Sequence, residues 1–409
     1  MKDLTDNSRG CGCSAPNPKT GPKPGLGISS SRISIMSSME DVPAACSTGP
    51  SDPKTAYEKP GFQLCTYVDR FMDTAAGPVP IIKPRLGIKD LISTFFVRCG
   101  INRYSYTVAP GLYAIGSPDK SSEVLVTANF KLTFDHLRKE LKYINAWILV
   151  LDTKGINVWC AASEGTFATA ELVKQIKICS LEKVVDHKHI IVPQLGATGV
   201  SARSVQKQSG FRVVYGPIRA NDIPVFLTNN NTADKTMRQV TFTLYERFIL
   251  TPVEIQIVIK PALITALIVF ILSGFGPGIF SFSALWPRGV VCVLALATGI
   301  LSGAFVTPVL LPFVPFRQFA LKGIIIGSVF SILLLFGISS PIHLYSPGSA
   351  GLVALFLFSV AISSFLAMNF TGTTPFTSPT GVELEMKRFI PIQLSALIIS
   401  TGLWIYSAF

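Results

Sequence analysis

Apolar and polar residues in the middle of the chain follow two alternating periods. Short apolar runs of strand length recur between longer stretches in which apolar residues repeat at helical spacing. The apolar runs are Glu123–Thr127, Trp147–Leu151, His189–Pro193 and Phe211–Tyr215, and the helical stretches are Lys131–Ile144, Ala170–Cys179 and Ser201–Ser209. Strands that alternate with helices at this spacing predict βαβ units around a parallel sheet.

The last third of the chain has a different pattern, in which long apolar runs are separated by short polar segments. These runs are Ile257–Leu272, Val290–Val306, Ala320–Ile338, Gly351–Met368 and Phe389–Ala408. At about 1.5 Å per residue, a helix made from each run crosses or nearly crosses a hydrocarbon core of about 30 Å. The pattern therefore predicts an all-α transmembrane domain with five helices over residues 257–409.

The sparse charges of this region predict its orientation. After Lys260 the basic residues are Arg288, Arg317, Lys322, Lys387 and Arg388, and the acids are Glu383 and Glu385. If the preceding domain is cytoplasmic, the inner loops hold Arg317 with Lys322 and Lys387 with Arg388. The outer loops then hold only Arg288, which agrees with the excess of bases in inner loops. We expect a multi-pass protein of the cell inner (cytoplasmic) membrane with its soluble domain in the cytoplasm. Without an acid at membrane depth, the helices are expected to be an anchor or docking platform rather than a pump.

Composition supports this division of the chain. Hydrophobic residues make up 49% and charged residues 15% of the 409 residues, whereas soluble domains carry roughly 25% charged residues. The net charge of +12 contains no basic run, which favours an anionic membrane surface over nucleic acid as its partner.

The domain boundaries follow from changes in composition. Residues 1–60 are rich in Ser, Pro and Gly and are predicted to be a disordered leader without a signal core. The soluble α/β domain is predicted over residues 61–225, with an entry segment up to Pro80, and a linker over residues 226–256. Cys11 and Cys13 could bind a soft metal, but the pair lacks the four ligands of a structural site, and the alternative is a flexible tail with incidental thiols.

Loops that follow parallel strands meet at one edge of the sheet, where open α/β sheets bind ligands. The loops Thr127–Thr133, Asn157–Cys160 and Gly196–Gly199 are therefore expected to line a common crevice. Thr127 and Thr133 are candidates for cofactor binding there, or else a strand end and a helix-face residue. The chain carries no G-x-G-x-x-G, phosphate-loop or H-E-x-x-H motif.

One cysteine lies on the second of these loops. Asn157 is a favourable N-cap residue, and Cys160 three positions later is expected near the same face of a short helix. Gly155 and Gly165 would set this helix off from its surroundings, and the small Ala161–Ala162 pair would let a large flat ligand approach the backbone. The residues alone leave two interpretations open, a metal ligand or a small packed thiol.

The run Asn157-Val158-Trp159-Cys160-Ala161-Ala162 closely resembles the cap-helix motif of the mercury-methylating corrinoid proteins. Gly165-Thr166-Phe167 is similar to the same family, as is the order of a soluble domain and five membrane helices. In the mercury-methylating family, this soluble domain is related to the large subunit of the corrinoid iron–sulfur protein. The resemblance covers roughly residues 60–409 and implies a Rossmann-like corrinoid-binding α/β domain followed by the transmembrane helices.

The resemblance implies a cobalamin whose cobalt takes the thiolate of Cys160 as its lower axial ligand. The other cap residues would then shape the surface under the corrin ring: Asn157, Val158, Trp159, Ala161 and Ala162. A thiolate is a strong anionic donor, so it should ease methyl transfer to Hg(II), giving methylmercury. The implied partners are a ferredoxin-like iron–sulfur protein as reductant and a methyl donor similar to methyltetrahydrofolate. An external reductant agrees with the lack of cluster-type cysteine spacing in this chain.

The chain departs from the family motif directly after the alanines. Where the family has Gly-Lys, this sequence has Ser163-Glu164, so an anion replaces a cation beside the implied site. One alternative is therefore a corrinoid methyl carrier of one-carbon metabolism, as in acetyl-CoA pathways, without mercury activity. A second alternative is a non-catalytic membrane protein whose α/β domain binds a partner or a nucleotide.

Overall fold

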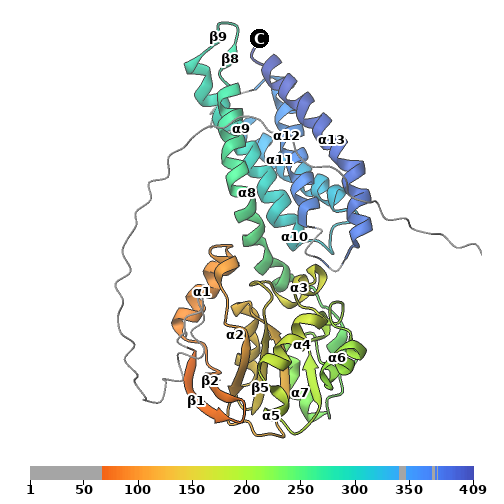
Figure 1. Cartoon of the computed structure of the whole chain (residues 1–409). Coiled ribbons are helices and arrows are strands. Elements are labelled where there is room, and N and C mark those ends of the chain that lie inside the picture. The colour runs from red at the N-terminus through yellow and green to blue at the C-terminus, as the bar shows by residue number, and fades with distance from the viewer. Residues whose placement is uncertain (1–66, 340–346, 371–373, 375) are drawn as a thin grey trace, which may run out of the picture. The chain divides into compact units, whose positions relative to one another are not determined.

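The computed structural model describes residues 67–339, 347–370, 374 and 376–409. The predicted leader over residues 1–60, with Cys11 and Cys13, lies outside the described residues. The described chain forms a mixed α/β domain followed by long apolar helices (Figure 1). This order of parts confirms the fold class that the hydropathy pattern predicts.

The strands between residues 68 and 215 build a seven-stranded sheet in the order β1-β2-β3-β5-β4-β6-β7. They are β1 Val68–Thr74, β2 Gly77–Ile82, β3 Gly111–Ile115, β4 Val124–Ala128, β5 Ala146–Leu151, β6 His189–Val192 and β7 Arg212–Tyr215. The predicted parallel pairing holds for the block β5-β4-β6-β7. Strands β1 to β3 were not predicted from the sequence; β2 and β3 are parallel, whereas β3 runs antiparallel to β5 and β1 antiparallel to β2. The chain before β4 adds a hairpin and a short strand to the free edge of β5, so the sheet is mixed.

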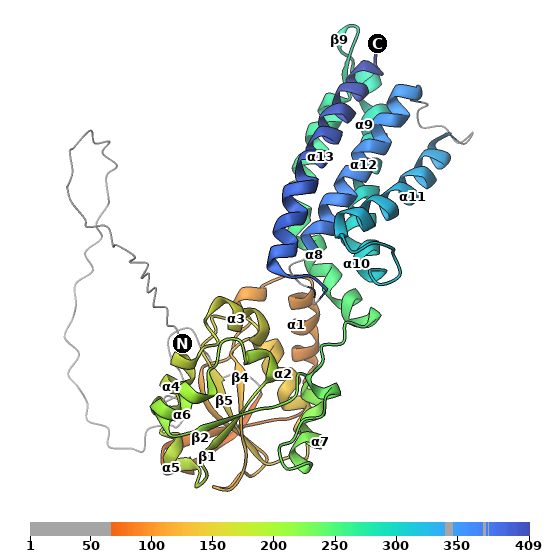
Figure 2. The ribbon, with the colours of Figure 1, turned by 90° about the vertical axis from the view of Figure 1, so that its right-hand side faces the viewer.

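Two helical layers cover the sheet. The helices are α1 Ile88–Arg98, α2 Lys131–Glu140, α3 Val158–Glu164, α4 Thr169–Ile178, α5 Leu181–Val184, α6 Ala202–Ser209 and α7 Ile223–Thr228. Helices α3 to α6 pack on one face, and α2 with α7 on the other. Figure 2 shows α4 and α6 on one side of the strands and α2 and α7 on the opposite side.

Alternating side chains of the central strands supply both cores. In β4, Val124 and Val126 face the layer of α3 to α6, while Leu125 between them faces the layer of α2 and α7. All three are buried, which explains why the strand is continuously apolar rather than alternating with polar residues. The short apolar runs found in the sequence are thus strands covered on both faces.

Among the described residues, five helices are long and apolar enough to cross a membrane. They are α8 Leu244–Leu272, α9 Phe282–Ile300 with its continuation Leu301–Val306 and α10 Thr307–Val309, α11 Phe319–Ser339, α12 Ser349–Asn369 and α13 Pro379–Tyr406. A small hairpin of β8 Phe275–Gly276 and β9 Ile279–Phe280 joins α8 to α9. Each predicted apolar run falls on one of these helices, although the boundaries of the domains remain predictions.

Helix α8 begins within the predicted linker, at Leu244 rather than near Ile257. Its start is a capping box, in which the Thr243 hydroxyl accepts from the amide of Glu246 and the Glu246 carboxylate accepts from the amide of Thr243. Such a box satisfies two amide donors that the first helical turn leaves open. A scan for apolar runs misses this start because Glu246, Arg247 and Glu254 interrupt the apolar residues of the first turns.

Small residues let the apolar helices approach closely. A β-carbon added to Gly303, in the continuation of α9, would lie 2.5 Å from the Ser363 carbonyl oxygen of α12. One at Gly323 of α11 would lie 2.7 Å from the same oxygen. Gly299 precedes Gly303 by one turn and meets Ser359 in the same way. Such spacing of small residues is the usual device for packing helices where lipid surrounds them.

Most charged residues of this region lie in helices rather than in the predicted loops, although Arg317 does lie between α10 and α11. Arg288 is part of α9 and Lys322 of α11, and both side chains are buried. Arg288 donates to the Trp404 carbonyl at 2.6 Å, and Lys322 donates to the Val314 carbonyl at 2.6 Å. The assignment of these two residues to loops is therefore wrong, since each reaches from a helix to carbonyls at the end of another segment.

Candidate functional site

The chain changes direction between two adjacent parallel strands, β4 and β6. The connection after β4 runs through α2 to β5, and the connection after β6 runs through α6 to β7, on the opposite face of the sheet. Strands β4 and β6 pair at Leu125 and Ile191. At such a switch point the two connections diverge and leave a crevice outside the carboxyl ends of the strands.

A cavity of about 350 Å³ occupies this place. Its lining comes from β4, α2, the start of α3, and the ends of β6 and β7: Leu125, Val126, Thr127, Thr133, His136, Leu137, Asn157, Val158, Trp159, Ile191, Pro193, Leu195, Gly216, Pro217, Ile218, Arg219, Ala220 and Ile223. The lining is mostly apolar with a few polar groups, which is typical of a small-molecule or cofactor site. Five residues proposed from the sequence line it: Thr127, Thr133, Asn157, Val158 and Trp159.

Cys160 lies on the short helix α3 and does not itself line this cavity, whereas Asn157, Val158 and Trp159 directly before it do. The Oδ1 atom of Asn157 accepts from the Cys160 amide at 3.0 Å, which caps the helix as its sequence predicts. The Nδ2 atom of the same side chain lies 3.5 Å from the Cys160 sulfur. Cys160 is exposed, so its thiol can reach a ligand. One residue, Asn157, therefore lines the cavity, begins the helix and contacts the sulfur.

Asn129, at the end of β4, fixes the loop that leads into α3. Its buried Oδ1 atom accepts from the amide of Thr153, the hydroxyl of Thr153 and the amide of Gly155 at 2.8–3.1 Å. Gly155 has a φ of +75°, a left-handed conformation that favours glycine. The Asn129 side chain thus positions the cap helix. This role follows from contacts in the folded structure and not from the sequence pattern.

The two alanines of the cap motif face the protein. Ala161 and Ala162 are buried in the core beneath α3. A β-carbon added to Gly199 would meet the Phe167 carbonyl oxygen and lie 3.1 Å from the Cα of Ala162. Here the small side chains let the loop Gly196–Gly199 pack tightly under α3. That loop supports the cap helix, and Pro193 and Leu195 just before it line the cavity instead.

The outer face of α3 carries the departure from the family motif. Trp159, Cys160, Ser163 and Glu164 are all exposed. Residues three and four positions apart on a helix are neighbours, so Ser163 and Glu164 lie one turn beyond Cys160 on the same face. A ligand that covers the sulfur from this side would meet the carboxylate of Glu164.

His136 and the loop Gly216–Ala220 are cavity residues that the sequence interpretation missed. His136 follows Thr133 by one turn of α2, and the loop follows β7 at the same sheet edge as the other candidates. Burial lowers the pKa of His136, and the positive charges of Arg98 and Lys139 lower it further. The Nε2 atom of the His136 ring accepts from the Arg98 guanidinium at 3.1 Å. Helical spacing from Thr133 was the available signal for this residue.

Comparison with known proteins gives matches to the part of the chain that contains this site. Residues 99–227 match the family described as CO dehydrogenase/acetyl-CoA synthase delta subunit. The acetyl-CoA decarbonylase/synthase complex subunit gamma of Methanopyrus kandleri is 37% identical over 123 residues, 29% of this chain and 26% of that protein. The corrinoid/iron-sulfur protein large subunit of Moorella thermoacetica is 31% identical over 121 residues, 29% of this chain and 27% of that protein.

The match is partial on both sides. The chain spans about a quarter of the length of these curated relatives (26–27%), and the helices from α8 onward lie beyond the matched residues. The matched segment nevertheless contains β3 to β7, the cavity and the cap helix. Through this segment the α/β domain is a distant homologue of the acetyl-CoA decarbonylase/synthase gamma subunits and the corrinoid/iron-sulfur protein large subunit.

Proposed function

We propose that the protein is a membrane-anchored, cobalamin-dependent methyltransferase that methylates inorganic Hg(II), with Cys160 as the lower axial ligand of cobalt. One observation carries the proposal: an exposed thiol lies on a capped helix whose first residues line an apolar cavity. The site falls within residues 99–227, the segment related to corrinoid proteins. The soluble domain is proposed to face the cytoplasm.

The residues present fit a corrinoid. The cavity is apolar enough to take a hydrophobic part of the cofactor, and Thr127, Thr133 and His136 supply a few polar contacts within it. The exposed stripe of α3 offers Trp159 and Cys160 to a flat ring lying across the cavity mouth. Within this arrangement Ala161 and Ala162 act indirectly, by letting the cap helix sit close to its supporting loop.

When bound, a cobalamin supplies a transferable methyl group on cobalt. The thiolate of Cys160 would hold the metal and donate electron density to it, which would favour methyl transfer to an electrophile such as Hg(II). Asn157 holds the amide of Cys160 and lies against the sulfur, so it orients the ligand before the cofactor arrives. Trp159 and the apolar lining exclude water from the face beneath the ring. A ferredoxin-like protein is the proposed reductant, and a methyltetrahydrofolate-like compound the proposed methyl donor.

A visible spectrum of the full chain, purified in detergent and loaded with cobalamin, tests the cysteine ligand. Replacing Cys160 by alanine is expected to change the cobalt absorption bands and to abolish methylmercury formation. Cys179→Ala is the matched control, because this half-buried thiol ends α4 away from the cavity. If Cys160→Ala binds cobalamin with an unchanged spectrum, the axial-ligand proposal is wrong.

A corrinoid methyl carrier of one-carbon metabolism is the second candidate. The Methanopyrus kandleri relative is, by its name, a subunit of an acetyl-CoA decarbonylase/synthase complex. Glu164 also places an anion where the mercury-methylating family has a cation. Both candidates predict the same Cys160 spectrum, so the assay that separates them is turnover. Wild-type protein with reductant and methyl donor should form methylmercury from Hg(II); a protein that accepts the methyl group but leaves Hg(II) unchanged is a carrier.

A further inference from the structure

A group of possible metal ligands lies at the amino ends of β4 and β6, opposite the carboxyl ends that border the cavity. Glu123 directly precedes β4, while His187 and His189 lie at the start of β6. The amino ends of these parallel neighbours lie together, whereas the cavity lies at their carboxyl ends. One donor atom from each of the three side chains falls within 4.8 Å of the other two. None of the three residues lines the cavity.

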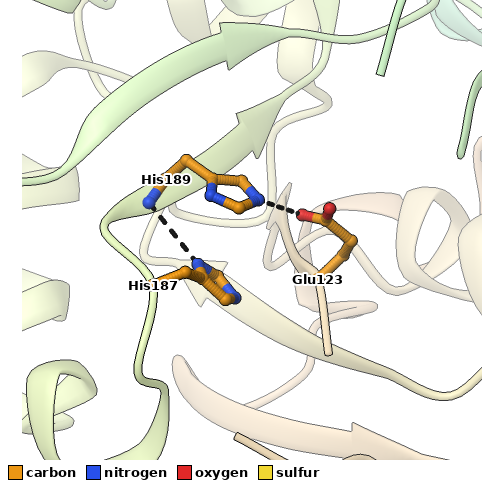
Figure 3. Close-up of side chains that lie close together, drawn as sticks. All are labelled: Glu123, His187 and His189. Carbon is orange, nitrogen blue, oxygen red and sulfur yellow. Dashed lines mark hydrogen bonds and ion pairs between the residues drawn. The ribbon is translucent and has the colours of Figure 1, made fainter. Parts of the chain in front are cut away.

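The three side chains converge on one another (Figure 3). The Nε2 atom of His189 lies 2.7 Å from Oε2 of Glu123, and the rings of His187 and His189 stack with centroids 4.0 Å apart. All three residues are half-buried. This burial limits solvation of the donors without closing them off, so an ion can enter.

Neighbouring groups hold the remaining donor atoms in the manner of an outer coordination shell. A ring nitrogen of His187, Nε2, lies 3.0 Å from the carbonyl oxygen of Ser122. Because a carbonyl only accepts, this hydrogen bond places the proton on Nε2 and leaves the lone pair on Nδ1. That lone pair receives only a 3.5 Å contact from the His189 amide. The Nδ2 atom of Asn231 donates to Oε1 of Glu123 at 2.8 Å, which leaves Oε2 for the metal.

Asn231 provides an independent sign that a polar ligand belongs here. Within the part of the chain that the structure describes, its Oδ1 atom is buried and has no hydrogen-bond partner. The residue also has a φ of +58°, and Asn230 before it has a φ of +52°. A buried acceptor without a donor is costly, and strained backbone tends to persist at functional sites. A water molecule on a metal held by Glu123 would supply the missing donor.

We propose that Glu123, His187 and His189 form a divalent-metal site that takes Zn²⁺. Two imidazoles and one carboxylate are a donor set that zinc uses, with its fourth position open to water. The metal takes the place of the hydrogen between His189 and Glu123, and the ring then carries its proton on Nδ1. The ion ties together the starts of β4 and β6 and the segment around Asn231, and so braces the two strands that border the cavity.

Zinc titration of the full chain in detergent, without cobalamin, tests this site. We expect one Zn²⁺ to bind, and His187→Gln and His189→Gln each to weaken its binding by at least about tenfold. His136→Gln and Cys160→Ala are the matched controls, because they remove a histidine and an exposed thiol outside the group; both should bind zinc as the wild type does. Unchanged affinity in the two glutamine variants would overturn the proposal.

X-ray absorption at the zinc edge gives a readout that does not depend on how the variants fold. Wild-type protein with one equivalent of Zn²⁺ should show only nitrogen and oxygen neighbours, at about 2.0–2.2 Å. A sulfur shell at about 2.3 Å would place the ion on cysteines instead and exclude the site. Absence of stoichiometric zinc in the wild type would leave Glu123 and His189 as an ordinary hydrogen-bonded pair and reject the proposal.

Discussion

Buried charges are handled differently in the α/β domain and in the long helices. In the α/β domain, Lys131 and Arg138 of α2 each bridge Asp90 of α1 and Asp135 at 2.7–2.8 Å, and their side chains are at most 10% exposed. Each charge therefore has two opposite partners. The Arg138 guanidinium also donates to the carbonyl of Lys83 at 2.6 Å, which ties the chain before α1 to the same group.

In the long helices, buried charges meet the backbone instead. Arg288 donates to the carbonyls of Phe275 and Trp404, and Lys322 to those of Leu311 and Val314. Glu385 accepts from the amide of Ala320 at 2.6 Å. These are carbonyls and amides that segment ends leave open, so a single charge caps another segment. The α/β domain gains rigidity from charge networks, and the helices from caps and close backbone packing.

Removing a carboxylate from the α/β network should have the largest effect. Asp135→Ala leaves two buried cations with one acid between them, and breaking a buried pair costs about 3–5 kcal/mol. Native-state hydrogen exchange in the full chain measures this loss in β4 and β5 separately from the helices. Lys387→Ala, which breaks the exposed pair with Glu383, should cost less than about 1 kcal/mol. Equal losses in the two variants would contradict the distinction.

Filling a close helix contact should have the next largest effect, confined to the long helices. A β-carbon at Gly303 would press on the backbone of Ser363, and such overpacking costs about 1–3 kcal/mol. Gly337 of α11 is the control, because nothing lies within 4 Å of the position of its β-carbon. Thermal unfolding in detergent should show Gly303→Ala destabilised and Gly337→Ala unchanged or slightly stabilised. If both variants behave alike, backbone proximity does not hold these helices together.

Acid should weaken the α/β domain through Asp90. Burial alone raises the pKa of this carboxyl, but hydrogen bonds from Lys131, Gly87 and Arg138 outweigh it and hold the pKa below its ordinary value. A carboxyl with a lowered pKa in the folded state stabilises the fold above its unfolded pKa of about 3.9 and loses this contribution as the pH falls further. The protection of the β4 and β5 amides, corrected for intrinsic exchange, should therefore fall as the pH is lowered from 6 to 3. It should fall less in Asp90→Asn than in the wild type. The same pH dependence of protection in the wild type and in Asp90→Asn would show that another group controls acid unfolding.

Sequence periodicity predicted the elements whose pattern is local. Strands β4 to β7, helices α2, α4 and α6 and the long helices follow from runs that are covered on both faces or embedded in an apolar region. The hairpin β1–β2 was not predicted, because Pro78 and Pro80 interrupt its strand pattern. Helix α1 was not predicted either. Apolar residues such as Ile88 and Phe95 remain exposed on it, so its apolar pattern does not mark a buried face.

The candidate site was predictable where a motif defines it and not where packing does. Asn157 could be identified as a cap from its residue type and its place before the helix. The burial of Ala162 depends on the close approach of Gly199, a contact distant in the sequence. The role of Asn129 likewise depends on three donors beyond the next helix and strand. Spacing alone does not fix such contacts, because they arise only when the sheet assembles.

The smallest effect on stability, and the sharpest on the choice between the two functions, is expected at Glu164. The Glu164 carboxylate is exposed and takes part neither in the charge network of the α/β domain nor in the backbone contacts of the long helices. Glu164→Lys should therefore change stability by less than about 0.5 kcal/mol. It restores, one turn beyond Cys160, the cation of the mercury-methylating motif. Methylmercury formation should rise if the cation assists that reaction, while the cobalamin spectrum stays unchanged. Glu182→Lys on α5, which reverses a charge outside the cap helix and the cavity lining, controls for net charge. An equal response in both variants would mean that the field of the whole domain, and not the cap helix, sets the rate.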